Sequence, residues 1–287
     1  MNFCMKQIIG IGVCVGVLSC LTHLWRESAS RDAVGNPLQL THATQSPLRS
    51  TPAGDAGRKN KESFAELLAV LATAQEKASA LASYTAILEM QEDVDGELRP
   101  LDRIHLKFRQ KPFSVYMRWA DNNQEVLFVE GKNDNRLLVK PAKGLAALMR
   151  VLHLDPDSPM AKQTFRYSIT DSGLENLVNR IQKSYAARDD WSSVAECSVS
   201  DATVSNIDVT AYDVRFLNSD VSPDYSGSRF YFDKRSGLLI GLDNFGWSDE
   251  PQPRLIEHYR YLEINPGISL QDDDFEEANP EYEFVAR

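Results

Sequence analysis

The sequence has few cysteines, and most of them lie close to the N-terminus. Of the four, Cys4, Cys14 and Cys20 belong to an N-terminal apolar segment, which leaves Cys197 alone in the rest of the chain. A single cysteine cannot form an internal disulfide, so the folded part must rely on its core for stability. In a strand-like context a lone cysteine is usually a small buried apolar residue rather than a reactive thiol.

Catalytic and metal-binding motifs are also missing. Of the five histidines, only His105, His153 and His258 lie beyond residue 60, and none stands in an HExxH or comparable metal spacing. No GxSxG nucleophile elbow occurs. We therefore expect a non-enzymatic protein without cofactor or metal, and keep an uncharacterised hydrolase only as a third hypothesis.

Positive charge is scarce, since the formal net charge is −10. Residues 271–287 hold seven acidic residues and one basic residue, a net of −6. An acidic protein without a basic stripe does not attract nucleic acid or anionic lipid head groups. The three aspartates at 272–274 lack the spacing and turn glycine of a calcium loop, so we interpret them as a solvated acidic turn.

Only one long apolar run occurs, from Ile8 to Leu24, with Lys6 before it and Arg26 after it. It lies at the lower limit of the about 17–25 residues that span a bilayer. Residues 1–26 are therefore predicted to be a signal peptide or an N-terminal membrane anchor on the periplasmic side of a cell envelope. Cys20 ends a lipobox-like phrase and is the lipidation candidate. Cleavage, retention and lipidation all remain open.

Two further regions follow this segment. Residues 27–60 are rich in Ser, Thr, Pro, Gly and Ala, have few large apolar residues, and are predicted to be a flexible linker. Residues 61–287 carry regular apolar patterns and are predicted to form a single domain. Only the N-terminal segment is expected to contact the membrane.

The patterns in this domain predict three helices and many strands. Apolar residues at three and four residue steps predict helices over Ser63–Tyr84, Ala142–Leu152 and about Ser172–Ala187. Alternation and turn signals such as Asp95-Gly96 predict strands. These strands are expected at Tyr84–Glu92, Arg103–Gln110, Phe113–Trp119, Val126–Gly131, Arg136–Val139, Glu196–Val204, Ile207–Leu217, Ser228–Asp233, Leu238–Trp247 and Leu255–Ile264.

Strands and helices do not alternate regularly along the chain. This arrangement predicts an α+β fold built on one large curved antiparallel sheet, with the N-terminal helix and two further helices packed on it.

Several phrases resemble a bacterial envelope family known only as a domain of unknown function. The resemblance covers nearly all of residues 62–284 and implies no established activity. It is carried by Tyr84-Thr85-Ala86, Val94-Asp95-Gly96, the run from Arg109 to Met117, the run from Glu125 to Gly131, Asp274-Phe275 and the run from Asn279 to Tyr282.

A second, looser resemblance is to the LolA-like half-barrel lipoprotein carriers. The run from Phe230 to Leu238 is similar to the aromatic strand and short turn of that group. The resemblance implies a half-barrel that holds an acyl chain or another apolar ligand between its sheet and helices, or that senses mislocalised lipoproteins. No residue of that group is diagnostic for lipid handling, so none is carried over.

Large apolar side chains on the predicted strands are the candidates to line such a cavity. We therefore hypothesise an exported envelope protein that binds a lipid, an acyl chain or a lipoprotein. The alternative is a membrane-tethered structural or regulatory interaction domain, in which these side chains fill an ordinary core. The oligomeric state stays open. The candidates are Phe108, Phe113, Val115, Met117, Trp119, Phe128, Phe230, Phe232 and Trp247.

Overall fold

The computed structural model describes residues 53–142, 151–162, 165–249 and 252–284. Cys20 and the predicted signal or anchor segment lie outside the described residues, as does most of the predicted linker. No helix in the described ranges is long and apolar enough to cross a membrane.

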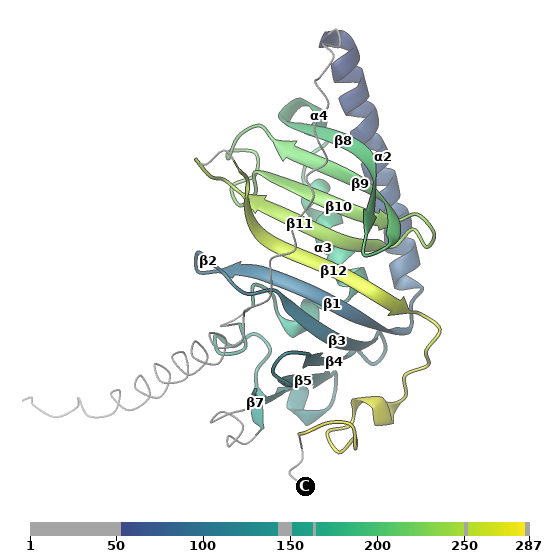
Figure 1. Ribbon diagram of the computed structural model, residues 1–287, viewed down its shortest axis with the longest axis vertical. Coiled ribbons are helices and arrows are strands. Elements are labelled where there is room, and N and C mark those ends of the chain that lie inside the picture. Colours follow the sequence, from purple (N-terminus) through teal and green to yellow (C-terminus); the bar gives the residue numbers. More distant parts are fainter. Residues whose placement is uncertain (1–52, 143–150, 163–164, 250–251, 285–287) are drawn as a thin grey trace, which may run out of the picture.

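One 12-stranded antiparallel sheet dominates the structure (Figure 1). Its order is β7-β6-β5-β4-β3-β1-β12-β11-β10-β9-β8, with the short β2 paired to β1. The expected α+β class with a large antiparallel sheet is thus confirmed. The strands are β1 (Ser83–Val94), β2 (Glu97–Leu98), β3 (Asp102–Arg109), β4 (Ser114–Trp119), β5 (Glu125–Val129), β6 (Leu137–Lys140), β7 (Leu152–Leu154), β8 (Ala195–Val204), β9 (Ile207–Phe216), β10 (Gly227–Asp233), β11 (Leu239–Gly246) and β12 (Arg254–Asn265).

Side-chain alternation gives the sheet two faces. In β4, Val115, Met117 and Trp119 lie in the main core, while Tyr116 between them belongs to a second core on the opposite side. We call the face toward the main core the inner face and the other the outer face. The helices α2 (Ala53–Ser79), α3 (Leu174–Tyr185) and α4 (Trp191–Val194) all contribute to the inner core.

Helix α2 buries the apolar stripe that its sequence predicts. Its buried residues include Phe64, Leu67 and Leu71. The helix begins at Ala53, ahead of the expected domain boundary at residue 61, and ends at Ser79 rather than Tyr84. Asn60 ties this early part to the domain. Its amide nitrogen donates to the carbonyl oxygens of Ser192 in α4 and Ala195 just after it, and its amide oxygen accepts from the Cys197 backbone N–H, at 2.7–3.0 Å.

Helix α3 begins at a glycine that the packing requires. Gly173 has a φ of +100°, and a Cβ there would lie 2.4 Å from the Phe108 ring. The first backbone N–H of the helix, at Leu174, donates to the Tyr84 hydroxyl at 2.9 Å. The start of α3 is therefore held against β1 and β3 of the inner face.

The predicted helix over Ala142–Leu152 needs a correction at its end. Residues 143–150 lie outside the described residues, but Leu152 begins the edge strand β7, where Leu137 pairs with Leu154. Three residues paired to β6 replace the expected last turn, because a short edge strand leaves too few residues for alternation to be recognised.

The outer face of β4–β6 is covered by the last part of the chain, residues 268–284, which we call the C-terminal strap. Its apolar residues pack on this face, with Tyr282 stacked on Tyr116 at 3.8 Å. Its acidic residues pair with basic residues of the sheet, for example Asp272 with Arg109 at 2.8 Å. The acidic turn predicted from the three aspartates is therefore partly neutralised by the sheet rather than surrounded only by water.

Candidate functional site

A small apolar cavity lies between the inner face and the chain that leads into α3. Its floor comes from strands β1, β4, β5, β6 and β12, and its volume is about 90 Å³. Alternation turns these floor side chains inward, where they line one side of the space. They are Leu88, Met90, Met117, Trp119, Val126, Leu137, Tyr259 and Tyr261.

The roof of the cavity is more polar than its floor. It is formed by residues 165–172 and by Leu177 and Arg180 of α3. Leu177 and Arg180 are three residues apart, so they share one face of the helix. Ser168, Asp171, Ser172 and Arg180 add hydroxyl and charged groups to this side. The cavity is therefore apolar toward the sheet and polar along one edge.

Two buried glutamates lie on neighbouring strands beside the cavity, and one of them, Glu92, lines it. Glu92 of β1 lies directly opposite Glu257 of β12, and the two residues are 4% and 0% exposed. Glu257 accepts hydrogen bonds from Arg166 Nε and from the hydroxyls of Tyr167 and Tyr225, at 2.8–2.9 Å. Its second oxygen accepts from the amide of Asn244 at 2.7 Å. Both oxygens of the buried Glu257 carboxyl group are thus satisfied by hydrogen bonds.

Glu92 has fewer donors than its neighbour. It accepts from the Arg166 backbone N–H at 2.8 Å and from the Tyr259 hydroxyl. Burial raises the pKa of Glu92, while the Tyr259 and Arg166 hydrogen bonds oppose that rise. Burial, reinforced by the charge of Glu257, also raises the pKa of Tyr167, so this hydroxyl remains a donor near neutral pH. Arg166 thus contacts both buried glutamates, Glu257 through its guanidinium and Glu92 through its backbone N–H.

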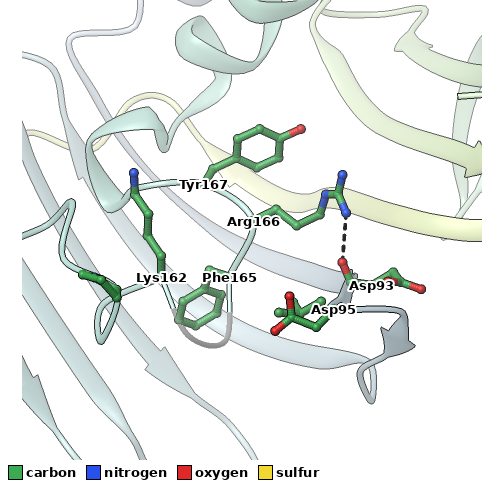
Figure 2. A pocket seen from close by; sticks show the side chains of 8 residues that line it. Asp93, Asp95, Lys162, Phe165, Arg166 and Tyr167 are labelled. Carbon is green, nitrogen blue, oxygen red and sulfur yellow. Dashed lines mark hydrogen bonds between the residues drawn. The ribbon is translucent and has the colours of Figure 1, made fainter. Parts of the chain in front are cut away.

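A wider polar pocket of about 550 Å³ adjoins the cavity, since Phe165 and Tyr167 line both. Figure 2 shows Arg166, which lies between Phe165 and Tyr167, reaching toward Asp93 at the end of β1. Its guanidinium donates to the Asp93 carbonyl at 3.0 Å. The same pocket carries Asp95 and Lys162. We call it the polar mouth. The arrangement places a charged opening beside an apolar space, which is the layout that an amphiphilic molecule requires.

The predicted lining residues are divided between the cavity and the core. Met117 and Trp119 line the cavity. Trp247 is 37% exposed beyond the end of β11, where its indole N–H donates to the Ser222 carbonyl at 2.8 Å. The others pack into the inner core without lining the cavity; they are Phe108, Phe113, Val115, Phe128, Phe230 and Phe232.

The sequence analysis did not identify the two buried glutamates, although a signal for them was present. Glu92 follows Leu88 and Met90 at two-residue steps, and Glu257 precedes Tyr259 and Tyr261 in the same way. A carboxylate on the apolar phase of a strand is a buried carboxylate. Among the described residues, no three His, Cys, Asp or Glu side chains come together in a way that would hold a metal ion.

Comparison with solved structures gives matches to a LolA superfamily protein and to a lipoprotein. A LolA superfamily protein from Nitrosomonas europaea matches at 9% identity and TM-score 0.32, over 72% of this chain and 96% of that chain. The lipoprotein LppX from Mycobacterium tuberculosis matches at 13% identity and TM-score 0.41, over 72% and 98%. The looser resemblance expected from the sequence was to the first of these groups. Similarity this distant transfers no ligand to the present chain.

No curated protein sequence matches the chain significantly. The phrases singled out in the sequence nevertheless have a family counterpart, and the match runs over residues 81–284, the whole of the sheet, helices α3 and α4 and the C-terminal strap. The chain therefore belongs to the family described as a protein of unknown function, DUF1571.

Proposed function

We propose that this protein is a non-enzymatic envelope protein that binds a lipid or acyl chain in the cavity between its inner face and α3. The observation that carries the proposal is the cavity itself, with an apolar floor and a polar edge that opens beside the polar mouth. In this proposal residues 1–26 export or anchor the chain, residues beyond them tether it, and the domain works on the periplasmic side.

The size of the cavity restricts the ligand. Its volume of about 90 Å³ is well below the roughly 300–1,000 Å³ of sites for drug-sized molecules. A thin hydrocarbon chain is the shape that suits this space. Met90 and Met117 line it, and methionine side chains adapt their conformation more readily than branched ones. We therefore infer that binding enlarges the cavity through these two side chains.

Photolabelling of the full chain in phosphatidylcholine vesicles tests the proposal. The probe is a 16-carbon fatty acid with a diazirine near its methyl end, and peptide mapping after irradiation locates the adducts. We expect adducts on β1, β4 or residues 165–172. Adducts confined to residues 1–26 would overturn the proposal and favour the tethered interaction domain, for which the exposed Leu217 and Trp247 offer apolar surface.

Two variants on one strand make this test specific. Val126→Phe fills the cavity from its floor and should strongly reduce labelling there. Val129→Phe adds the same bulk on the outer face, where Val129 packs with the C-terminal strap, and should leave labelling unchanged. Equal labelling of both variants would mean that the probe binds elsewhere.

A further inference from the structure

Among the residues that the structure describes, Arg180 is the cation of the cavity lining and has no acidic partner. Its side chain is half-buried on α3. Within the described ranges it makes no ion pair and donates no hydrogen bond, and its guanidinium instead lies 3.7 Å from the centre of the Tyr167 ring. Arginines that face the interior of a protein are normally paired with a carboxylate. A partner of negative charge is therefore missing at this position.

The position of Arg180 is fixed by its surroundings. The Tyr167 ring, on which it stacks, is held by its hydroxyl, which donates to Glu257 at 2.9 Å. Leu177, one turn earlier on the same face of α3, is buried and lines the cavity as well. The guanidinium is thus held at the edge of the cavity rather than free to turn into water.

The neighbouring cations are already engaged. Lys162 Nζ, in the polar mouth, lies 2.7 Å from Asp157, and Arg166 Nε lies 2.8 Å from Glu257. The carboxylates of the lining do not neutralise Arg180 either. Glu92 accepts hydrogen bonds from Tyr259 and Arg166, and Asp171 is exposed, so water weakens its charge. A ligand head group is what remains to pair with Arg180.

We propose that the cavity selects a single-chain amphiphile with an anionic head group, which pairs with Arg180 while its chain lies over Met117 and Val126. This inference rests on the proposed function and names its ligand class. Arginine binds both carboxylate and phosphate groups through parallel N–H donors, so a fatty acid and a lysophosphatidate share the required chemistry. The inference names a single chain because the cavity, at about 90 Å³, must already enlarge to admit one.

Competition against the same diazirine probe tests the inference. Unlabelled hexadecanoate, hexadecanol and palmitoyl lysophosphatidate are added to the full chain, and the concentration that halves cavity labelling is measured for each. We expect hexadecanoate to compete about tenfold better than hexadecanol, which corresponds to about 1.4 kcal/mol. The ratio between hexadecanoate and lysophosphatidate then shows whether carboxylate or phosphate is preferred.

Variants of α3 assign the preference to its residue. Arg180→Gln should make hexadecanoate and hexadecanol equal, whereas Arg180→Lys keeps the charge and should retain most of the difference. Lys183→Gln removes an exposed charge from the same helix and should change nothing. Equal competition in the native chain, or a preference that survives Arg180→Gln, would overturn the anionic selectivity and leave the lipid site standing. The absence of any cavity labelling would instead overturn the proposed function.

Discussion

The inner face of the sheet is covered by different elements in two groups of strands. The first group is β8–β11, and the second is β1, β3–β6 and β12. We call the first group the packed half and the second the cavity half. In the packed half, aromatic rings from the helices meet aromatic rings from the sheet, as where Tyr185 contacts Phe230 at 6.0 Å and Trp191 contacts Phe216 at 5.8 Å. Helices α2 and α4 both lie against β8, as Figure 1 shows. This half is filled by apolar side chains.

The cavity half is covered by α3 and by residues 165–172 rather than by the long helix. Its inner face keeps an empty space, and it buries charge at Glu92 and Glu257. The cavity therefore lies where the cover of the sheet changes from helix to irregular chain. Buried polar groups stabilise that irregular chain in place of apolar packing.

Truncation of one large side chain in each half should give the largest effects. Phe230→Ala should lower the free energy of unfolding by about 3–5 kcal/mol, because a fully enclosed ring is lost. Met117→Ala should cost about 2 kcal/mol, the lower end for such changes, since Met117 already borders an empty space. Urea unfolding of both variants measures the difference. Equal losses would show that the two halves are packed alike.

Removal of a charge from the cavity half should have the next largest effect. Glu257→Gln leaves the Arg166 guanidinium without its carboxylate and should cost about 3 kcal/mol. The matched control on the same strand is Glu263→Gln, since Glu263 is 74% exposed and lies 3.6 Å from Arg103. That change should cost at most about 0.5 kcal/mol. A loss below about 1 kcal/mol for Glu257→Gln would show that charge does not hold this half together.

The pH dependence of stability should come from the cavity half as well. Burial raises the pKa of Asp102, beside Trp119, from 3.8 to about 6. The folded state therefore holds this proton more tightly, so the contribution of Asp102 is favourable below pH 3.8 and is lost as pH rises through about 6. The loss is below about 3 kcal/mol.

Urea unfolding between pH 4 and pH 7.5 checks this sign. Asp102→Asn should flatten the decline in stability, and Asp121→Asn, which removes an exposed carboxylate nearby, should change it much less. A native chain whose stability is constant or rises over this interval would contradict the expectation. Asp243 should have the opposite effect on stability, which is lost only in acid as pH falls toward about 2. Burial of Asp243 is outweighed by His258 and Arg260, which lower its pKa to about 2.

Most strands were predictable because their apolar residues alternate. Ile207–Leu217 was expected and β9 spans Ile207–Phe216, while Asp95 and Gly96 form the expected turn with positive φ at both residues. The strand β7 and the one-turn helix α4 were not predicted, since three or four residues contain no readable period. The alternation of apolar residues within a strand also does not predict which strands pair, such as β1 with β12.

Only the apolar character of the candidate site could be predicted from the sequence. Alternation correctly places Met117 and Phe230 on the inner face, but it does not say which part of that face a helix fills. Phe230 is covered by Tyr185, whereas Met117 is left beside a space. Arg180 could not be identified either, because an arginine on a helix is ordinarily assigned to the solvent side. The position of Arg180 at the cavity depends on its contact with the Tyr167 ring, which comes from a segment outside α3.

The pairing of β1 with β12 has a consequence for how the chain folds. These strands lie next to each other in the middle of the sheet, yet Glu92 and Glu257 are 165 residues apart in sequence. On either side, β3–β6 and β8–β11 are joined to sequence neighbours, so each group can assemble early and locally. The central pair must wait for nearly the whole domain to be synthesised, and long-range pairing of this kind is slow. We therefore expect the seam between β1 and β12 to close last, bringing the two glutamates together only when the sheet is complete.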